Sequence, residues 1–132
     1  MSENPEIVMQ AKHIVKQFPA SHGRTLTACN DINLTMYKGR TLGIVGESGC
    51  GKSTFVRMVI SLDQPTSGEI LYHGKNITGL SKKETWENRQ NLQMVFQDPL
   101  ASFNPKMKIG DILTEPLMNY KKIKRSERNA KA

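Results

Sequence analysis

The sequence contains little cysteine, no long hydrophobic run and no strong charge excess outside its C-terminal end. Its two cysteines, Cys29 and Cys50, are too few for a disulfide-rich scaffold, and we expect both to be free thiols. The longest apolar runs have four or five residues, far short of the roughly 20 that span a bilayer. No membrane-spanning helix is therefore predicted. The acidic first six residues do not resemble a secretory signal.

The composition is that of one small globular domain. Of the 132 residues, 37% are hydrophobic and 23% are charged, which excludes a collagen-like or an intrinsically disordered chain. Lys and Arg outnumber Asp and Glu by 19 to 12, but residues 106–132 hold eight of the basic and three of the acidic side chains. We interpret this short basic run as a solvated helix end, because it lacks the interleaved aromatic side chains of a single-strand nucleic-acid binder.

Hydrophobic patterning predicts an α/β fold with an antiparallel portion near the beginning of the chain. Predicted strands occupy residues 7–18, 26–29, 32–36, 41–45, 69–72, 75–77 and 92–96. The segment 41–45 is a continuous apolar run, which is typical of a strand buried on both faces of a parallel sheet. Residues 69–72 and 75–77 are predicted to form a hairpin.

Three helices are predicted between and after these strands. The first begins at Lys52 and ends near Leu62, with four apolar side chains on one face: Phe55, Val56, Val59 and Ile60. The second begins after Ser81, which is predicted to form a capping box with Glu84, and ends near residue 91. The third has apolar residues at 109, 112, 113 and 117 and is strained near its end by Pro116.

The most informative segment follows the apolar run 41–45. It fits the pattern G-x-x-x-x-G-K-[ST] between a predicted strand and a predicted helix, which is the context of a phosphate-binding loop. With glycine near 7% of residues, the fixed positions coincide by chance on the order of once in 10⁴–10⁵ sites. We therefore predict that the loop binds a nucleotide through these residues: Gly46, Glu47, Ser48, Gly49, Cys50, Gly51, Lys52, Ser53 and Thr54.

Each residue type in this loop has a physical role. Glycine permits positive φ angles and a close approach of the backbone to a ligand, so that successive N–H groups form a nest for phosphate oxygens. The helix that begins near Lys52 adds the positive end of its dipole. Lys52 supplies a full charge to the β- and γ-phosphates, and the Ser53 hydroxyl is a ligand for Mg²⁺. We interpret Cys50 as a spacer; the alternative is a thiol whose modification blocks the site.

A second motif, at residues 97–105, narrows the choice of protein class. Kinases, GTPases and transport motors all carry phosphate-binding loops, so the loop alone does not distinguish them. Three stretches, 43–54, 65–70 and 97–105, resemble the ATP-binding subunits of ABC transporters, in particular those of oligopeptide, dipeptide and nickel importers. The likeness extends from about Val8 to the end of the chain. It implies an α/β phosphate-loop NTPase core, with a partial, mainly parallel sheet and helices, and an N-terminal antiparallel β portion.

The resemblance also implies roles for two further residues. In that family, the glutamine at the position of Gln97 reaches Mg²⁺ and the attacking water, and the loop after it touches the membrane partner. The alternative is a polar residue that only ends a strand. An aromatic residue at the position of Phe18 stacks on the adenine ring in that family; the alternative is a core phenylalanine that closes the first strand. The implied cofactors are ATP and Mg²⁺.

The partners implied by the resemblance are transmembrane permease subunits, a second ATP-binding subunit and, indirectly, an external solute-binding protein. No nucleic acid is expected as a partner. The implied location is the cytoplasmic face of the cell membrane, where the full-length protein is expected to act as a peripheral ATPase. Its implied task is to power the import of peptides or a similar solute.

Several parts of that family's machinery are missing from these 132 residues. No Leu-Ser-Gly-Gly-Gln type of signature loop occurs, and none of Asp63, Asp98 and Asp111 follows an apolar strand and precedes a glutamate. We interpret residues 1–132 as the N-terminal part of one nucleotide-binding domain, and we expect ATPase activity from the full-length protein but not from this chain alone. Two alternatives stay open: a nucleotide-binding module without hydrolysis, and another phosphate-loop enzyme such as a kinase.

Overall fold

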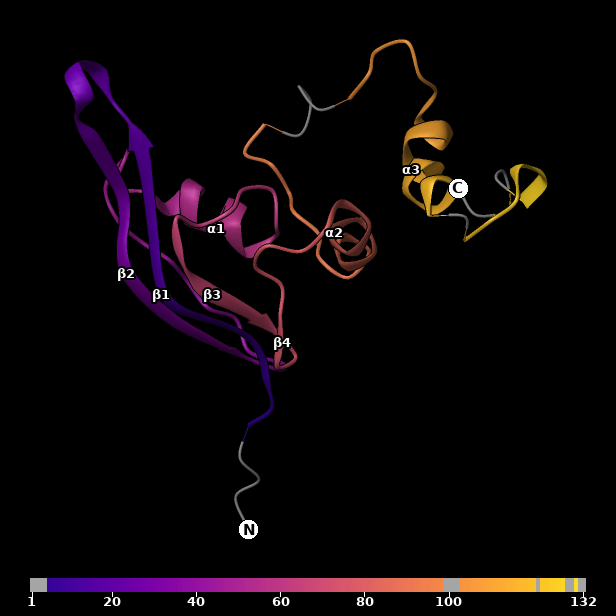
Figure 1. Ribbon diagram of the computed structural model, residues 1–132. Helices are drawn as coiled ribbons and strands as arrows, with labels where there is room; N and C mark the ends of the chain where they lie inside the picture. The colour runs from indigo at the N-terminus through magenta and orange to yellow at the C-terminus, as the bar shows by residue number, and fades with distance from the viewer. Residues whose placement is uncertain (1–4, 99–102, 121, 128–129, 131–132) are drawn as a thin grey trace. The chain divides into compact units, whose positions relative to one another are not determined.

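The computed structural model describes residues 5–98, 103–120, 122–127 and 130. The chain forms two compact units, one that ends at Leu92 and one that begins at Gln93 (Figure 1). The first unit contains β1 (Ile7–Pro19), the 3₁₀-helix η1 (Ser21–Gly23), β2 (Thr25–Tyr37), α1 (Lys52–Val59), β3 (Ser67–Tyr72), β4 (Lys75–Asn76) and α2 (Lys82–Arg89). The second contains α3 (Ile109–Asn119) and the 3₁₀-helix η2 (Arg125–Glu127).

The sheet of the first unit is antiparallel throughout, with the strand order β2-β1-β3-β4. Figure 1 shows the two long strands β1 and β2 side by side, with β3 on the other side of β1. β1 and β2 are joined by a short polar turn, and β3 and β4 by the predicted His73-Gly74 turn. The expected antiparallel portion and its hairpin are therefore confirmed.

A bulge in the middle of β1 keeps one face of this strand apolar. His13 and Asp31 both have positive φ angles of 52°, and the pairing of β1 with β2 shifts between Ala11 and Ile14. The His13 N–H donates a hydrogen bond to Asn33 Oδ1 at 2.8 Å, and His13 Nδ1 lies 2.7 Å from Asp31 Oδ1. The extra residue brings Ile14 to the face that carries Ala11, although their odd spacing would otherwise separate them.

The core lies between this face of the sheet and α1. It consists of eight buried residues: Met9, Ala11, Ile14, Cys29, Phe55, Met58, Ile70 and Ile77. α1 contributes Phe55 and Met58, which are three residues apart and therefore share one face of the helix. Of the predicted apolar face, Phe55 is buried and Val59 packs against the core, while Met58, which the prediction left out, is buried as well. The helix also ends at Val59, three residues before the predicted end.

α2 begins as its capping box predicts. The Ser81 hydroxyl accepts a hydrogen bond from the Glu84 N–H, and the Glu84 carboxylate accepts one from the Ser81 N–H at 3.1 Å. These two bonds satisfy N–H groups that have no partner within the helix. The helix then runs to Arg89, two residues short of the predicted end.

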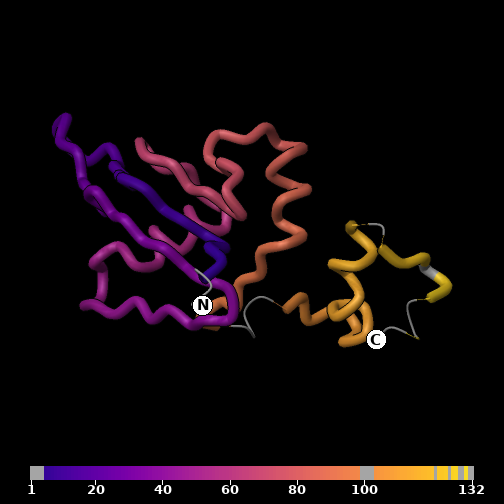
Figure 2. Tube along the Cα trace, turned by 90° about the horizontal axis from the view of Figure 1, so that it is seen from below, coloured from indigo at the N-terminus to yellow at the C-terminus, as the bar shows by residue number. Residues whose placement is uncertain are grey.

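The predicted strand 41–45 is not a strand in this structure. Residues 41–47 have no regular secondary structure and are exposed. Figures 1 and 2 show this segment running back along β2 before α1 begins, and a pocket of about 200 Å³ separates Ile44 and Val45 from Ile32 and Leu34 of β2. No ladder of hydrogen bonds joins the segment to β2 or to any other described strand. The prediction was wrong here because a strand requires a paired neighbour as well as an apolar sequence.

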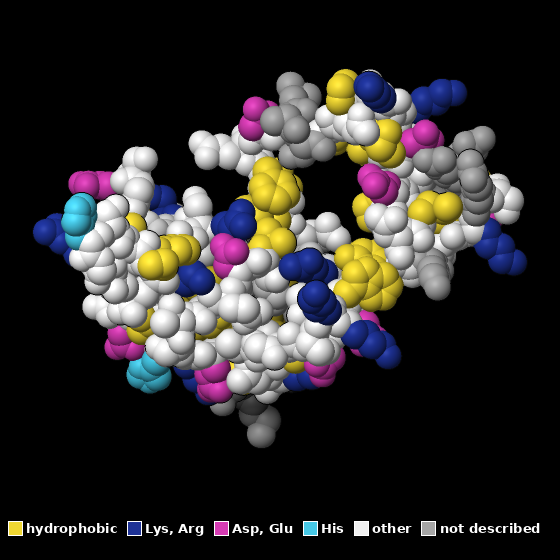
Figure 3. Space-filling model, turned by 45° about the horizontal axis from the view of Figure 1, so that its top comes forward, with side chains coloured by type: hydrophobic (Ala, Val, Ile, Leu, Met, Phe, Trp, Pro, Cys, Tyr) yellow, Lys and Arg dark blue, Asp and Glu magenta, His cyan; other side chains and the backbone are white. Residues whose placement is uncertain are grey.

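The predicted strand 92–96 fails for the same reason. These residues are irregular, no described strand pairs with them, and Val95 is 88% exposed. Leu92 alone packs against the core of the first unit. In the second unit, the third predicted helix is confirmed as α3, which continues through Pro116 to Asn119. Figure 3 shows hydrophobic side chains exposed on one face of the molecule.

Candidate functional site

The loop Gly46–Thr54 joins the irregular segment after β2 to the first turn of α1. Gly49 has a φ angle of 80° and Gly51 one of 93°, both in the left-handed region that side chains disfavour. Gly51 is the residue before the helix, and α1 begins at Lys52 as predicted. The Phe55 N–H donates to Gly51 O at 2.9 Å. The N–H groups at the start of α1 have no partners within the helix and are available to an anion.

Gly51 also fixes the loop against the sheet. A Cβ atom at this position would overlap the carbonyl oxygen of Ala28 in β2, and it would lie 3.6 Å from Cys29 Sγ. The Cys29 thiol points at the same place and is 3.9 Å from Gly51 O. Because the backbone of the loop rests directly on β2, only glycine fits at position 51. The sequence motif gives no signal for this contact, since Ala28 and Cys29 are more than twenty residues away along the chain.

The Lys52 ammonium lies inside the loop. Its Nζ donates hydrogen bonds to Gly46 O at 2.6 Å and to Glu47 O at 2.5 Å, and it lies 3.3 Å from Cys50 Sγ. The cation therefore sits at the centre of the turn that the glycines form, with backbone carbonyls as its partners. A full positive charge inside a ring of backbone groups is suited to phosphate oxygens.

An apolar pocket of about 200 Å³ adjoins the loop. Its walls are side chains of β2, of residues 44–45 and of α1, and Cys50, Gly51 and Lys52 form its end. Burial raises the pKa of the Cys29 thiol, which keeps it protonated at neutral pH. Cys29 and Cys50 are both free, as predicted.

Phe18 lies near the end of β1, opposite Leu26 of β2. Leu26 is two residues from Ala28, which corresponds to roughly 7 Å along a strand. The Phe18 side chain is 38% exposed, and Lys16 Nζ lies 5.1 Å from the centre of its ring. Phe18 is thus a partly exposed aromatic residue on the strand beside the one that supports the loop. Its predicted role in stacking stays a prediction.

Gln97 belongs to the second unit, where it is exposed at a bend. The loop residues 99–102 that follow it, part of the third stretch that carries the family resemblance, lie outside the described residues. The structure therefore brings together the residues of the phosphate loop within the first unit, and Gln97 belongs to the second. Among the described residues, no helix has the length and hydrophobicity needed to cross a bilayer.

Comparisons with known proteins agree on one family. The family model described as "ABC transporter" matches residues 29–132. The chain is 44% identical over 128 residues to the oligopeptide transport ATP-binding protein OppF of Haemophilus influenzae, covering 91% of this chain and 39% of that protein. It is 45% identical to OppF of Bacillus subtilis, covering 90% and 39%, and 52% identical to OppF of Salmonella typhimurium, covering 74% and 29%. The chain thus spans two fifths or less of these relatives.

The fold is similar to solved ABC cassettes. The dimeric bacterial ABC transporter cassette MJ0796 aligns with a TM-score of 0.82 at 25% identity, covering 92% of this chain and 53% of that one. A post-hydrolysis state of the same cassette, bound to ADP and Pi, aligns with a TM-score of 0.79 at 24% identity over the same shares. These likenesses confirm the fold class of an ABC nucleotide-binding domain. The mainly parallel sheet that was also predicted is absent from the described residues, whose sheet is antiparallel, because the segments 41–45 and 92–96 form no strands there.

Proposed function

The chain belongs to the ABC transporter family, and from this premise we propose that it binds ATP with Mg²⁺ at the loop Gly46–Thr54. One observation carries the proposal: the Lys52 ammonium lies within a turn whose glycines have positive φ angles, at the first residue of a helix. The cation, the helix N-terminus and the accessible backbone N–H groups all favour a polyphosphate at this point.

When a nucleotide binds at this loop, Lys52 exchanges one set of hydrogen-bond acceptors for another. Lys52 gives up the carbonyl oxygens of Gly46 and Glu47, its present partners, and takes β- and γ-phosphate oxygens in their place. Hydrogen bonds between two ionised groups are stronger than those to a neutral carbonyl, so the exchange is favourable. The Ser53 hydroxyl, which is exposed in the first turn of α1, provides a ligand for Mg²⁺.

Two residues outside the loop complete the proposed nucleotide site. Phe18 stacks on the adenine ring, supported by its partial exposure and by its place on the strand beside β2. Gln97 contacts Mg²⁺ and the attacking water; its support is the family resemblance and its exposed amide, which is neutral and accepts a hydrogen bond from water.

For the full-length protein we propose an ATPase subunit that powers peptide import. The relatives named as oligopeptide transport ATP-binding proteins support this assignment. Residues 1–132 then form the N-terminal part of one nucleotide-binding domain. The proposed partners are transmembrane permease subunits, a second ATP-binding subunit and, indirectly, an external solute-binding protein. The proposed location is the cytoplasmic face of the cell membrane.

The nucleotide site is tested with Lys52→Ala. Removing a charge-assisted contact of roughly 1.5–3 kcal/mol should weaken MgATP binding at least about tenfold. The measurement is isothermal titration calorimetry, with Lys83→Ala as the matched control because Lys83 is exposed on α2 and away from the loop. Equal affinities of the wild type and Lys52→Ala would reject the site.

Hydrolysis and transport are tested separately. Residues 1–132 alone should release no phosphate above the level of Lys52→Ala, since no aspartate in this sequence follows an apolar strand and precedes a glutamate that could act as the base. In the full-length protein, Gln97→Ala should keep ATP affinity and lower kcat, because the glutamine acts chiefly at hydrolysis. Uptake of a labelled oligopeptide by cells should fall with Lys52→Ala; unchanged uptake would remove peptide import from the proposal.

A further inference from the structure

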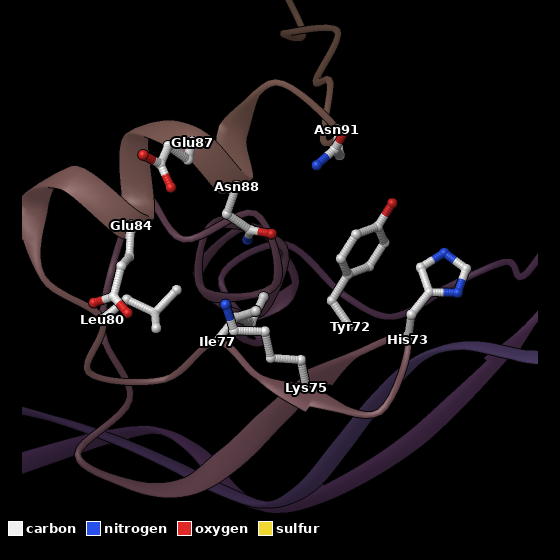
Figure 4. A pocket seen from close by; sticks show the side chains of 9 residues that line it. All are labelled: Tyr72, His73, Lys75, Ile77, Leu80, Glu84, Glu87, Asn88 and Asn91. Carbon is white, nitrogen blue, oxygen red and sulfur yellow. The ribbon is translucent and has the colours of Figure 1, made fainter.

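A nucleotide whose phosphates lie in the loop needs a surface for its base within reach of that loop. In the sheet, phenyl or phenol rings are carried by Phe18, Tyr37 and Tyr72. Tyr72 lines the pocket of about 350 Å³ between the β3–β4 hairpin and α2 that Figure 4 shows, and no residue of the phosphate loop lines this pocket. Tyr37 ends β2, roughly 30 Å along an extended strand from Ala28, where the loop rests. Phe18 is the ring that remains.

Phe18 lies on the face of the sheet that supports the loop. Side chains two residues apart in a strand share a face, so Phe18 follows Ile14 and Lys16 on the core face of β1. Lys16 pairs with Cys29 of β2, whose Sγ is 3.9 Å from Gly51 O. Phe18 therefore lies roughly 7 Å further along β1 from the point where the loop meets the sheet. This spacing leaves room for a ribose between the phosphates and the base.

The Lys16 ammonium lies over the Phe18 ring from a fixed position. Its Nζ is 5.1 Å from the ring centre, within the distance at which a cation and an aromatic face attract each other. The same Nζ donates a hydrogen bond to Gln64 O at 2.6 Å, which holds the long side chain in place. Although Lys16 lies over it, Phe18 is still 38% exposed, so ring surface remains for a second flat group.

The segment that follows α1 also binds the backbone of β1 beside Phe18. The Thr66 N–H donates to Val15 O at 2.8 Å, and the Thr66 hydroxyl accepts from the Gln17 N–H at 2.9 Å. Together with the bond from Lys16 to Gln64 O, these contacts connect the end of β1 to the segment after α1. Because the phosphate loop leads into the first turn of the same helix, the ring and the loop are held by one set of connected elements.

A cation on one face of a ring makes the opposite face a better partner for a base. The faces of a phenyl ring and of a purine both carry partial negative charge, which opposes direct stacking. An ammonium on the far side draws the π electrons towards itself and lessens this repulsion. It also restricts the rotation of the ring, so that a bound base has less side-chain freedom to remove.

We propose that Lys16 is a positioning residue for the nucleotide, whose ammonium holds the Phe18 ring on one face so that a purine base stacks on the other. The inference rests on the proposed nucleotide site. It adds a residue to which neither the loop motif nor the family resemblance assigns a role. Because Lys16 contacts the ring and not the phosphates, it should contribute to the binding of the base alone.

The test is calorimetric titration of the 132-residue chain with MgATP and with magnesium tripolyphosphate, which has the phosphates but no base. Lys16→Met should weaken MgATP binding about threefold and leave tripolyphosphate binding unchanged. Lys16→Arg keeps a cation that can lie over the ring, and it should bind both ligands as the wild type does. Lys12→Met removes a lysine of the same strand that pairs with Glu69. As the matched control, it should change neither affinity.

A double-mutant cycle measures whether Lys16 acts through the ring. Phe18→Ala should weaken MgATP binding about tenfold, and in that background Lys16→Met should have no further effect. Circular dichroism checks that each variant is folded.

Three results would each overturn the role of Lys16. They are an unchanged MgATP affinity of Lys16→Met, an equal loss of tripolyphosphate binding, and an undiminished effect of Lys16→Met in the Phe18→Ala background. Tripolyphosphate binding that disappears with Lys52→Ala would still support the loop in all three cases, so the nucleotide site can stand when this inference fails. A wild type that binds neither ligand would remove both.

Discussion

β1 and the segment 41–45 have similarly apolar sequences, but only β1 forms a paired strand. β1 pairs with β2 on one side and β3 on the other, and its Met9, Ala11 and Ile14 are buried. The segment 41–45 pairs with no strand in the described chain, and its Val45 is 94% exposed. The difference lies in the neighbours and not in the residues themselves.

The comparison teaches that hydrophobic patterning identifies strands only where partners are at hand. Antiparallel partners are supplied by adjacent hairpins, as between β1 and β2 or β3 and β4, whereas a parallel strand depends on crossover connections from elsewhere in a chain. Local sequence therefore predicts the first kind of strand better than the second.

The largest expected effect is the difference in stability lost when a side chain is truncated in β1 and in the segment 41–45. Ile14 is completely buried, so Ile14→Ala should cost about 2–5 kcal/mol in the free energy of unfolding through lost burial and a cavity. Val45→Ala should change that free energy by less than about 0.5 kcal/mol, because little surface is lost. Urea denaturation measures both. A cost at Val45 similar to that at Ile14 would mean that the segment is paired in solution.

A smaller effect should distinguish two glycines of the same loop. Gly51→Ala combines a φ angle of 93° with an overlap on Ala28 O and should cost about 2 kcal/mol or more. Gly49→Ala has a φ angle of 80° but open space around it, and it should cost about 1 kcal/mol. Thermal unfolding without nucleotide measures the difference. Equal costs would show that the loop does not rest on β2.

The smallest expected effect is the stability lost when the N-terminal cap of α2, which is formed by residues close in sequence, is removed. Ser81→Ala should cost about 1 kcal/mol through loss of the cap, while Ser21→Ala, at an exposed position in η1, serves as the control. Hydrogen bonds from Ser81 hold the pKa of Glu84 below its ordinary 4.5. Since the folded-state pKa is lowered, this contribution is present above pH 4.5 and is lost as the pH falls through the lowered value.

The prediction for Ser81→Ala is checked by measuring the free energy of unfolding as a function of pH. The difference in unfolding free energy between the wild type and Ser81→Ala should shrink as acid protonates Glu84. A constant difference from neutral pH down through that range would show that Glu84 takes no part in the cap.

Features set by local sequence were predictable, and those set by distant contacts were not. The capping box, the hairpin turn and the start of α1 depend on residues within a few positions of one another. The bulge at His13 depends on Asn33 and Asp31 in the neighbouring strand. For the site, the motif predicts the glycines and Lys52, but it gives no sign that Ala28 supports the loop or that Lys16 lies over the Phe18 ring.

The contact between Gly51 and β2 has a consequence for hydrogen exchange. β1 is paired on both sides, and β2, at the edge of the described sheet, is paired to β1 alone. The amides that these ladders bond should open only in the larger, rarer fluctuations of the first unit. Because Gly51 rests on Ala28, its amide should exchange as slowly as the paired amides of β2. The exposed residues 46–50 of the same loop should exchange quickly. Amide protection should therefore change abruptly at Gly51, and a ligand in the loop should slow exchange in β2 as well as in the loop itself.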